Sequence, residues 1–191
     1  RAWFGRLPGG LMMAAIGAST IFAAVSGSSV AATTTIGRVS IAEMRRYGYE
    51  GGMAAGAVAV AGTLSALIPP SAILVFYALI TDQSISRMLM AGIGPGLLSA
   101  TLFITVAYLM ARWFPQLSPV MKERVSWRAR LSTLSLTAPF GLLVLVVLGG
   151  IYSGLVTVTE AAALGALAAL GLLAASRRLS WPNLRHALDQ T

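Results

Sequence analysis

Long stretches of this 191-residue sequence contain no charged residue. Five such runs cover most of the chain: residues 7–37, 51–81, 88–111, 131–159 and 161–176. Four of them exceed the roughly 18 apolar residues that mark a membrane-spanning helix. Charged residues make up only 10% of the chain, whereas a water-soluble domain carries about 25%, so a soluble domain is excluded. The sequence predicts an all-α, polytopic protein embedded in a lipid bilayer.

The formal net charge of +8 does not predict a nucleic-acid partner. The 14 basic residues lie at the ends of the apolar runs instead of along one helix face, which indicates contact with a membrane surface. The sequence has no cysteine and a single histidine, His186, so it offers no clustered ligands for a transition metal. It also lacks a glycine-rich phosphate loop and paired carboxylates, so we expect no enzymatic activity and no cofactor.

Basic residues also predict which ends of the runs face the cytoplasm. If every run crossed the bilayer once, they would divide 11 against 3, but if residues 7–37 enter and return on one side, the division is 13 against 1. Only Arg87 then lies outside. The middle of that run, Val-Ser-Gly-Ser-Ser at residues 25–29, favours a turn over a helix. Arms of about 16 residues reach roughly 24 Å, less than the ~30 Å hydrocarbon core, so we predict a re-entrant helical hairpin.

The second run has an interruption of its own. As one helix, residues 51–81 would extend roughly 46 Å, well beyond one bilayer core. Residues 62–71 place Gly62, Pro69 and Pro70 in its interior, where both prolines lack a backbone donor and Pro70 disfavours helical geometry at Pro69. We therefore predict a broken transmembrane helix.

The predicted organisation follows the chain. Residues 1–50 form the hairpin and its cytoplasmic end, residues 51–111 the broken helix and a return helix, residues 112–130 a cytoplasmic loop, residues 131–176 two transmembrane helices, and residues 177–191 a cytoplasmic interfacial tail. The small residues in these helices permit close packing.

Glu160 is the only acidic residue flanked by apolar runs on both sides, and such residues often mark ion or proton pathways. Thr157 and Glu160 also have the spacing of a capping box, in which each side chain satisfies a backbone amide at the start of a helix. We favour this structural role over the ion-pathway role.

The two interruptions belong to neighbouring elements and can meet near the middle of the bilayer. Irregular backbone persists at that depth only within protein or beside a watery cavity, and there it offers free carbonyls and helix N-termini. Such groups suit a hard cation such as Na⁺ and part of an anionic solute. The predicted Na⁺ ligands are Ser26, Gly27, Ser28, Ser29, Gly62, Thr63 and Pro69. The predicted solute-binding residues are Ser28, Ser29, Pro70 and Ser71.

Two other functions stay open at this point. A proline in a membrane helix is often a kink and a Ser/Gly cluster is often a packing surface, so the chain can instead be a non-catalytic membrane scaffold without its own ion site. A passive channel ranks third, since the runs lack the polar or charged rings of a pore.

Four ordered motifs carry a resemblance to a known family. They are FAAVSGSSVA at residues 22–31, GTLSALIPPS at 62–71, AGIGPG at 91–96, and GIYSG at 150–154 followed by TEAA at 159–162. In this order they resemble the large membrane (permease) subunit of TRAP (tripartite ATP-independent periplasmic) transporters, over essentially the whole chain. Two positions depart from that family's pattern, because Ser65 stands where Gly is common and Val158 where Pro is common.

The resemblance implies a secondary active transporter in the cytoplasmic (inner) membrane of a bacterium or archaeon. It implies Na⁺-coupled uptake of an organic acid, such as a C4-dicarboxylate or sialic acid, delivered by a periplasmic substrate-binding protein. A small TRAP membrane subunit is the second implied partner. The tip at residues 26–29 and the break at 62–71 are then the first of two half-sites in an elevator-type, inverted-repeat transport domain. The second half-site lies outside this chain.

Overall fold

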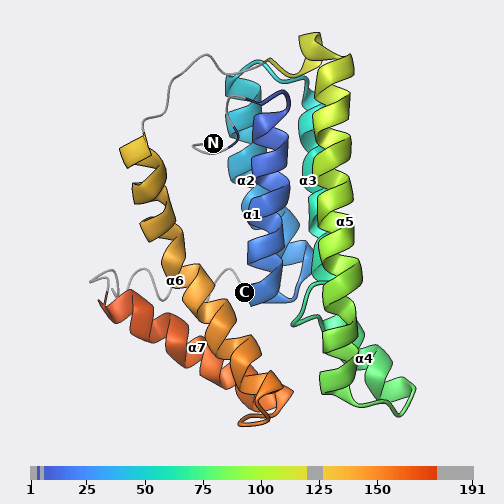
Figure 1. Cartoon of the computed structure of the whole chain (residues 1–191), viewed down its shortest axis with the longest axis vertical. Helices are drawn as coiled ribbons and strands as arrows, with labels where there is room; N and C mark the ends of the chain where they lie inside the picture. The colour runs from blue at the N-terminus through green and yellow to red at the C-terminus, as the bar shows by residue number, and fades with distance from the viewer. Residues whose placement is uncertain (1–3, 5–6, 120–126, 176–191) are drawn as a thin grey trace. The chain divides into compact units, whose positions relative to one another are not determined.

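A computed structural model describes residue 4, residues 7–119 and residues 127–175. The described residues are helical and contain no strand, which confirms the predicted all-α class for this part of the chain. The elements in Figure 1 are α1 (Gly10–Ser26), α2 (Ser29–Arg46), α3 (Gly51–Thr63), η1 (Leu64–Ala66), α4 (Ala72–Ile80), α5 (Ile85–Trp113), η2 (Pro115–Leu117), α6 (Trp127–Tyr152) and α7 (Val158–Ala175). The chain forms two compact units, Arg1–Phe140 and Gly141–Thr191.

Helix α1 is the core of the first unit. It packs against α2, α3 and α5, and its Met12, Met13 and Ile16 side chains are almost fully buried. Where the helices touch, small residues such as Ala23 and Ala54 are completely buried, which lets their backbones approach closely. Packing of this kind positions the tip and the break described below.

Helices α1 and α2 run in opposite directions and are joined by only two residues, Gly27 and Ser28 (Figure 1). Gly27 ends α1 in the left-handed conformation, with φ of 61°. Ser28 begins α2 as its N-cap. The interruption is shorter than residues 25–29, because these two caps let helix continue through Ser26 on one side and from Ser29 on the other.

The other ends of α1 and α2 also lie together. The Leu11 N–H, in the first turn of α1, donates to the hydroxyl of buried Tyr49, which follows α2, at 3.5 Å. Helix α2 extends past the charge-free run to Arg46, because charged residues end an apolar run without ending a helix.

The predicted break in the second run is present but starts later. Gly62 and Thr63 form the last turn of α3, which corrects their placement in the break. The backbone then tightens into η1 and becomes irregular until Ser71. A proline restricts mainly the residue before it, so Pro69 leaves the chain near Gly62 free to stay helical. The Pro69–Pro70 peptide bond is cis.

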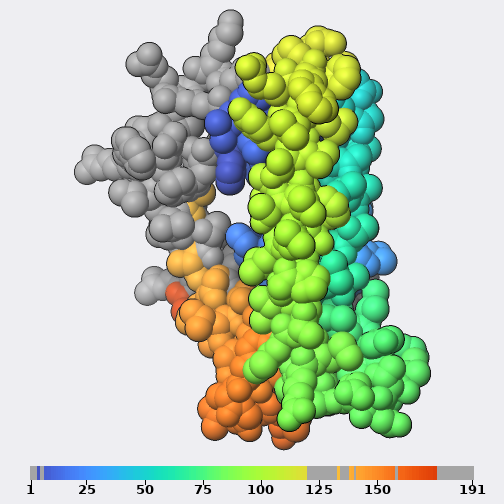
Figure 2. Space-filling view, turned by 45° about the vertical axis from the view of Figure 1, so that its right-hand side comes forward, coloured from blue at the N-terminus to red at the C-terminus, as the bar shows by residue number. Residues whose placement is uncertain are grey.

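Helix α5 is, among the described helices, the one with both the length and the apolar character to cross a membrane. The apolar segments 10–26, 51–66, 141–152 and 159–175 are shorter. Helix α5 begins three residues before the predicted run 88–111, because Ser84 caps it and Arg87 is accommodated in its first turn. Figure 2 shows α5 along the surface of the first unit, beside α3 and α4.

The second unit contains the end of α6 and all of α7. Helix α5 continues through Trp113 and α6 begins at Trp127, so helix occupies both ends of the segment 112–130 that we expected to be a loop. The predicted tail at 177–191, with His186, lies outside the described residues.

Candidate functional site

The hairpin tip and the helix break meet at Gly27 and Pro70. A Cβ atom added to Gly27 would collide with the Pro70 carbonyl oxygen, and the next nearest atoms are the Pro70 carbonyl carbon and then the backbone nitrogen of Ala72. Gly27 also has a positive φ, which glycine adopts without steric cost. Two independent features of this position therefore require glycine. The structure brings together the two segments that the sequence predicts to share a site.

A second close contact joins α2 to α3 one turn away. A Cβ atom on Gly62 would overlap the Thr33 hydroxyl oxygen. The Thr33 hydroxyl in turn donates to the Ser29 carbonyl at 2.7 Å. This contact places Ser29 and Thr63 on the wall of one hollow of about 310 Å³.

Two helices begin at the Gly27–Pro70 contact. Ser28 caps α2 by accepting the Ala31 N–H at 3.3 Å, and Ser71 caps α4 by accepting the Leu74 N–H at 3.3 Å. The Ser71 hydroxyl also donates to the Ala66 carbonyl at 2.8 Å, which ties the two sides of the break. Because helix N-termini carry partial positive charge, two of them at one place favour an anion.

Helix α5 holds the break from behind. A Cβ atom on Gly92 would lie 2.6 Å from the Leu67 carbonyl oxygen, and one on Gly96 would lie 3.0 Å from the Ile68 side chain. These two glycines belong to the AGIGPG motif at residues 91–96. The motif thus has a packing role, in which α5 closes directly onto the irregular backbone.

The remaining predicted Na⁺ ligands have varied environments. Ser26 is exposed at the end of α1 and its hydroxyl accepts the Ser28 N–H at 3.4 Å. The Thr63 hydroxyl donates to the Val60 carbonyl at 2.7 Å, and Pro69 is buried. No group of three or more His, Cys, Asp or Glu side chains occurs among the described residues. A cation at this place therefore depends on backbone and hydroxyl oxygens.

Two buried hydroxyls have no site role predicted from the sequence. Ser19 in α1 and Ser65 in η1 are 1% and 0% exposed, and neither hydroxyl has a hydrogen-bond partner among the described residues. An unsatisfied buried hydroxyl is costly, so such groups are often partnered by a bound ion or water. The available signal for Ser65 was its hydroxyl within residues 62–71, the segment where the sequence predicts the break.

The predicted capping box at the start of α7 is confirmed. One Glu160 carboxylate oxygen accepts the Thr157 N–H at 2.7 Å and the Thr157 hydroxyl at 2.8 Å. The Glu160 N–H donates back to the Thr157 hydroxyl oxygen at 3.3 Å. Glu160 thus has the structural role that we favoured from its spacing.

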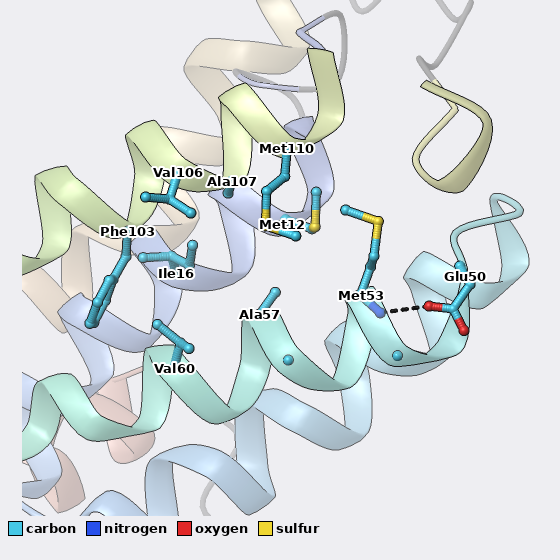
Figure 3. Close-up of a pocket in the computed structure, with 12 residues that line it drawn as sticks. Met12, Ile16, Glu50, Met53, Ala57, Val60, Phe103, Val106, Ala107 and Met110 are labelled. Atoms are coloured by element: carbon cyan, nitrogen blue, oxygen red, sulfur yellow. Dashed lines mark hydrogen bonds between the residues drawn. The ribbon is translucent and has the colours of Figure 1, made fainter. Parts of the chain in front are cut away.

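An apolar cavity of about 540 Å³ lies between α1, α3 and α5 (Figure 3). Met12, Met53 and Met110 converge on it from the three helices, and Glu50 stands at one end. The Glu50 carboxylate caps α3 by accepting the Met53 N–H at 2.8 Å. The backbone N–H groups of Gly52 and Met53 hold the pKa of this carboxyl below its ordinary value. An apolar cavity with an ionised carboxylate at its end is unsuited to an anionic solute.

Comparison with known proteins adds independent information. Residues 1–191 match the protein-family model described as "Tripartite ATP-independent periplasmic transporter, DctM component". The chain is 46% identical over 167 residues to the C4-dicarboxylate TRAP transporter large permease protein DctM of Pseudomonas aeruginosa, a match that covers 87% of this chain and 38% of that relative.

Two further relatives show the same pattern. The DctM protein of the same description from Vibrio cholerae is 41% identical over 167 residues, covering 87% of this chain and 36% of the relative. The sialic acid TRAP transporter permease protein SiaT of Haemophilus influenzae is 30% identical over 168 residues, covering 87% and 26%. The chain thus spans less than half the length of each relative.

Proposed function

The chain belongs to the DctM family of TRAP transporter large permeases, and on this premise we propose that it supplies one half of a Na⁺-coupled site for an organic acid. The whole transporter, of which this chain is a part, then takes up the acid by secondary active transport. Transport of this kind needs no enzymatic step in the permease.

The meeting of Gly27 with Pro70 carries the proposal. It joins two interruptions of helical backbone, and interrupted helices near the middle of the bilayer are how many secondary transporters hold substrate and coupling ion. A scaffold needs only that the helices pack, whereas here two helix ends and an irregular segment converge on one point.

Na⁺ is the proposed coupling ion because the site is built from hard oxygen ligands without a carboxylate cluster. The last carbonyls of α1 have no partner within that helix, and the break offers carbonyls outside regular helix. Ser65 adds a buried hydroxyl with no partner among the described residues. We propose that Na⁺ binds the carbonyls of the tip and the end of α3, with Ser28 and Thr63 nearby.

The proposed solute is a carboxylate, held in part by the N-termini of α2 and α4. Their amides point positive partial charge at the space beside Ser28, Ser29, Pro70 and Ser71. The two relatives with the highest identities reported above are both named for C4-dicarboxylates, so a C4-dicarboxylate is our first choice and sialic acid our second.

We place the protein in the inner membrane with the hairpin re-entering from the cytoplasmic side. Helices α1 and α2 have 17 and 18 residues, or roughly 26 Å each, which is short for a full crossing. The contact between Leu11 and Tyr49 places both ends of the hairpin together, as a re-entrant segment requires. A periplasmic binding protein and a small membrane subunit are the proposed partners.

Uptake by the full-length permease, reconstituted in vesicles with its small subunit and binding protein, tests the function. We expect succinate to accumulate when Na⁺ is supplied outside and not when K⁺ replaces it. Sialic acid offered with its own binding protein distinguishes the two solute classes. Uptake that is equally fast without Na⁺, or absent for every carboxylate, would contradict the proposal.

A further inference from the structure

A groove runs along the contact between α2 and α3, on the face of α3 opposite the apolar cavity of Figure 3. Two hollows of about 540 and about 310 Å³ form it, and they share Thr33, Thr34 and Ala59. One end of the groove reaches Ser29 at the hairpin tip. The other end reaches Arg45. The groove therefore connects the proposed site with the cytoplasmic end of α2.

Arg38 and Arg45 are the charged residues on its wall. They are seven residues apart, so both lie on one face of α2, and both are exposed. At 1.5 Å per residue, Arg38 lies roughly 14 Å and Arg45 roughly 24 Å from Ser29 along the helix. Neither forms an ion pair with a carboxylate in the described part of the chain. The two charges form a row that leads away from the tip.

The position of Arg38 indicates that the groove contains water. It lies near the middle of α2, and an unpaired charge facing hydrocarbon is strongly disfavoured, so intramembrane arginines face protein or water-filled cavities. The nearby carboxylates of Glu43 and Glu50 do not line this groove, and Glu50 lines the apolar cavity instead. An anion therefore meets attraction on this face of α3 and repulsion on the other.

The residues in the middle of the groove do not bind a carboxylate strongly. The hydroxyls of Thr33 and Thr34 donate to the carbonyls of Ser29 and Val30, at 2.7 and 2.8 Å, so their protons are already engaged within α2. A carboxylate passing them accepts no bond from them. Weak holding between attractive charges suits passage, because a solute must be able to leave each position.

We propose that this groove is the path by which the carboxylate solute leaves the site toward the cytoplasm, and that Arg38 and Arg45 draw it along. The inference rests on the proposed function, since it concerns the same solute and site. It assigns the two arginines a role in release and none in holding the coupling ion. Release and ion binding are therefore affected separately.

The test uses the full-length transporter with its partners in phosphatidylcholine vesicles, with succinate, Na⁺ and binding protein supplied outside only. We expect the double variant Arg38→Gln/Arg45→Gln to lower Vmax about fivefold. The attraction between two unit charges about 4 Å apart in water changes a rate by about this factor. The external Na⁺ concentration for half-maximal uptake should not change. The double lysine variant should keep most of the rate. Arg46→Gln is the matched control, because Arg46 is exposed in the same last turn and does not line the groove.

Salt inside the vesicles provides a second measurement, in which the wild-type protein itself shows the effect and the glutamine variant serves as the control. Raising luminal salt at constant osmolarity should slow wild-type uptake by screening the two arginines and should not affect the glutamine variant. A wild-type Vmax in the glutamine variant, or an equal loss in Arg46→Gln, would overturn the inference. So would a defect seen only in vesicles that contain phosphatidylglycerol, which would assign the groove to a lipid headgroup. Failure of the proposed function appears differently, as wild-type protein without Na⁺-dependent uptake.

Discussion

Gly27 lies against the carbonyl oxygen of Pro70 so closely that no side chain fits between them. The contact joins the end of α1 and the start of α2 to the start of α4. The two contacting residues are 43 positions apart in the sequence. It follows that the tip cannot move away from the break without losing this packing. The two interruptions act as one structural unit.

The Gly62–Thr33 contact predicts a specific rescue. Gly62→Val should lower the melting temperature of the full-length permease and raise its half-saturating Na⁺ concentration, since overpacking costs about 1–3 kcal/mol. Gly62→Ala should be milder, and Thr33→Ala added to it should restore part of the loss by removing the overlapping hydroxyl. Gly56→Ala is the control, because no atom lies within 4 Å of its added Cβ. Equal effects at Gly56 and Gly62 would argue against the contact.

Variants of Ser28 distinguish a helix-capping role from an ion-binding role. Ser28→Ala removes the acceptor for the Ala31 N–H, which costs about 1 kcal/mol, and should weaken Na⁺ dependence only modestly. Ser28→Asn keeps a capping oxygen and should behave nearly as wild type. Na⁺ titrations of uptake measure both. A severe loss in the asparagine variant would show that the hydroxyl itself is essential.

Replacement of the Glu160 carboxylate by the amide of glutamine should have little effect. In Glu160→Gln the side-chain oxygen can still accept both bonds from Thr157, so Na⁺-coupled uptake and thermal stability should remain close to wild type. Glu160→Ala removes both acceptors and should lower the melting temperature. If the glutamine variant folds normally but loses coupling completely, the carboxylate belongs to an ion pathway instead.

Cysteine labelling tests the re-entrant topology. This chain contains no cysteine, so introduced thiols here have no local background. Leu7→Cys and Arg46→Cys, at the two ends of the hairpin, should both react from the cytoplasmic face of the full-length protein after its other cysteines are replaced. Gln83→Cys, between α4 and α5, should react from the periplasmic face. Labelling of positions 7 and 46 from opposite faces would rule out the hairpin.

Local features of the site could be predicted from the sequence. Small residues and hydroxyls indicated the turn at Gly27 and Ser28, and the two consecutive prolines indicated the break, because both effects act on neighbouring backbone. The predicted positions of the helix ends were less accurate, because the end of a charge-free run does not mark the end of a helix. Thus α2 includes Arg38, and Gly62 stays helical.

Contacts between elements could not be predicted in this way. The overlap of Gly62 with Thr33 and the approach of Gly92 to Leu67 depend on how helices pack, and no local pattern specifies the partner. The α2–α3 groove was missed for the same reason. From the sequence, its arginines are indistinguishable from other cytoplasmic charges. Only the structure shows that small residues of α3 lie opposite them.

The central claim is that tip and break share one Na⁺ site, and the Na⁺ dependence of Gly27→Val tests it most directly. Valine cannot adopt the positive φ without strain and its side chain would meet the Pro70 carbonyl oxygen. Gly17→Val is the matched control in α1, where no atom lies within 4 Å of an added Cβ. The measurement is the Na⁺ concentration for half-maximal uptake by the complete transporter, with expression and folding verified. We predict an increase of at least about tenfold for Gly27→Val and little change for Gly17→Val. An unchanged Na⁺ dependence in a folded Gly27→Val protein would contradict the account.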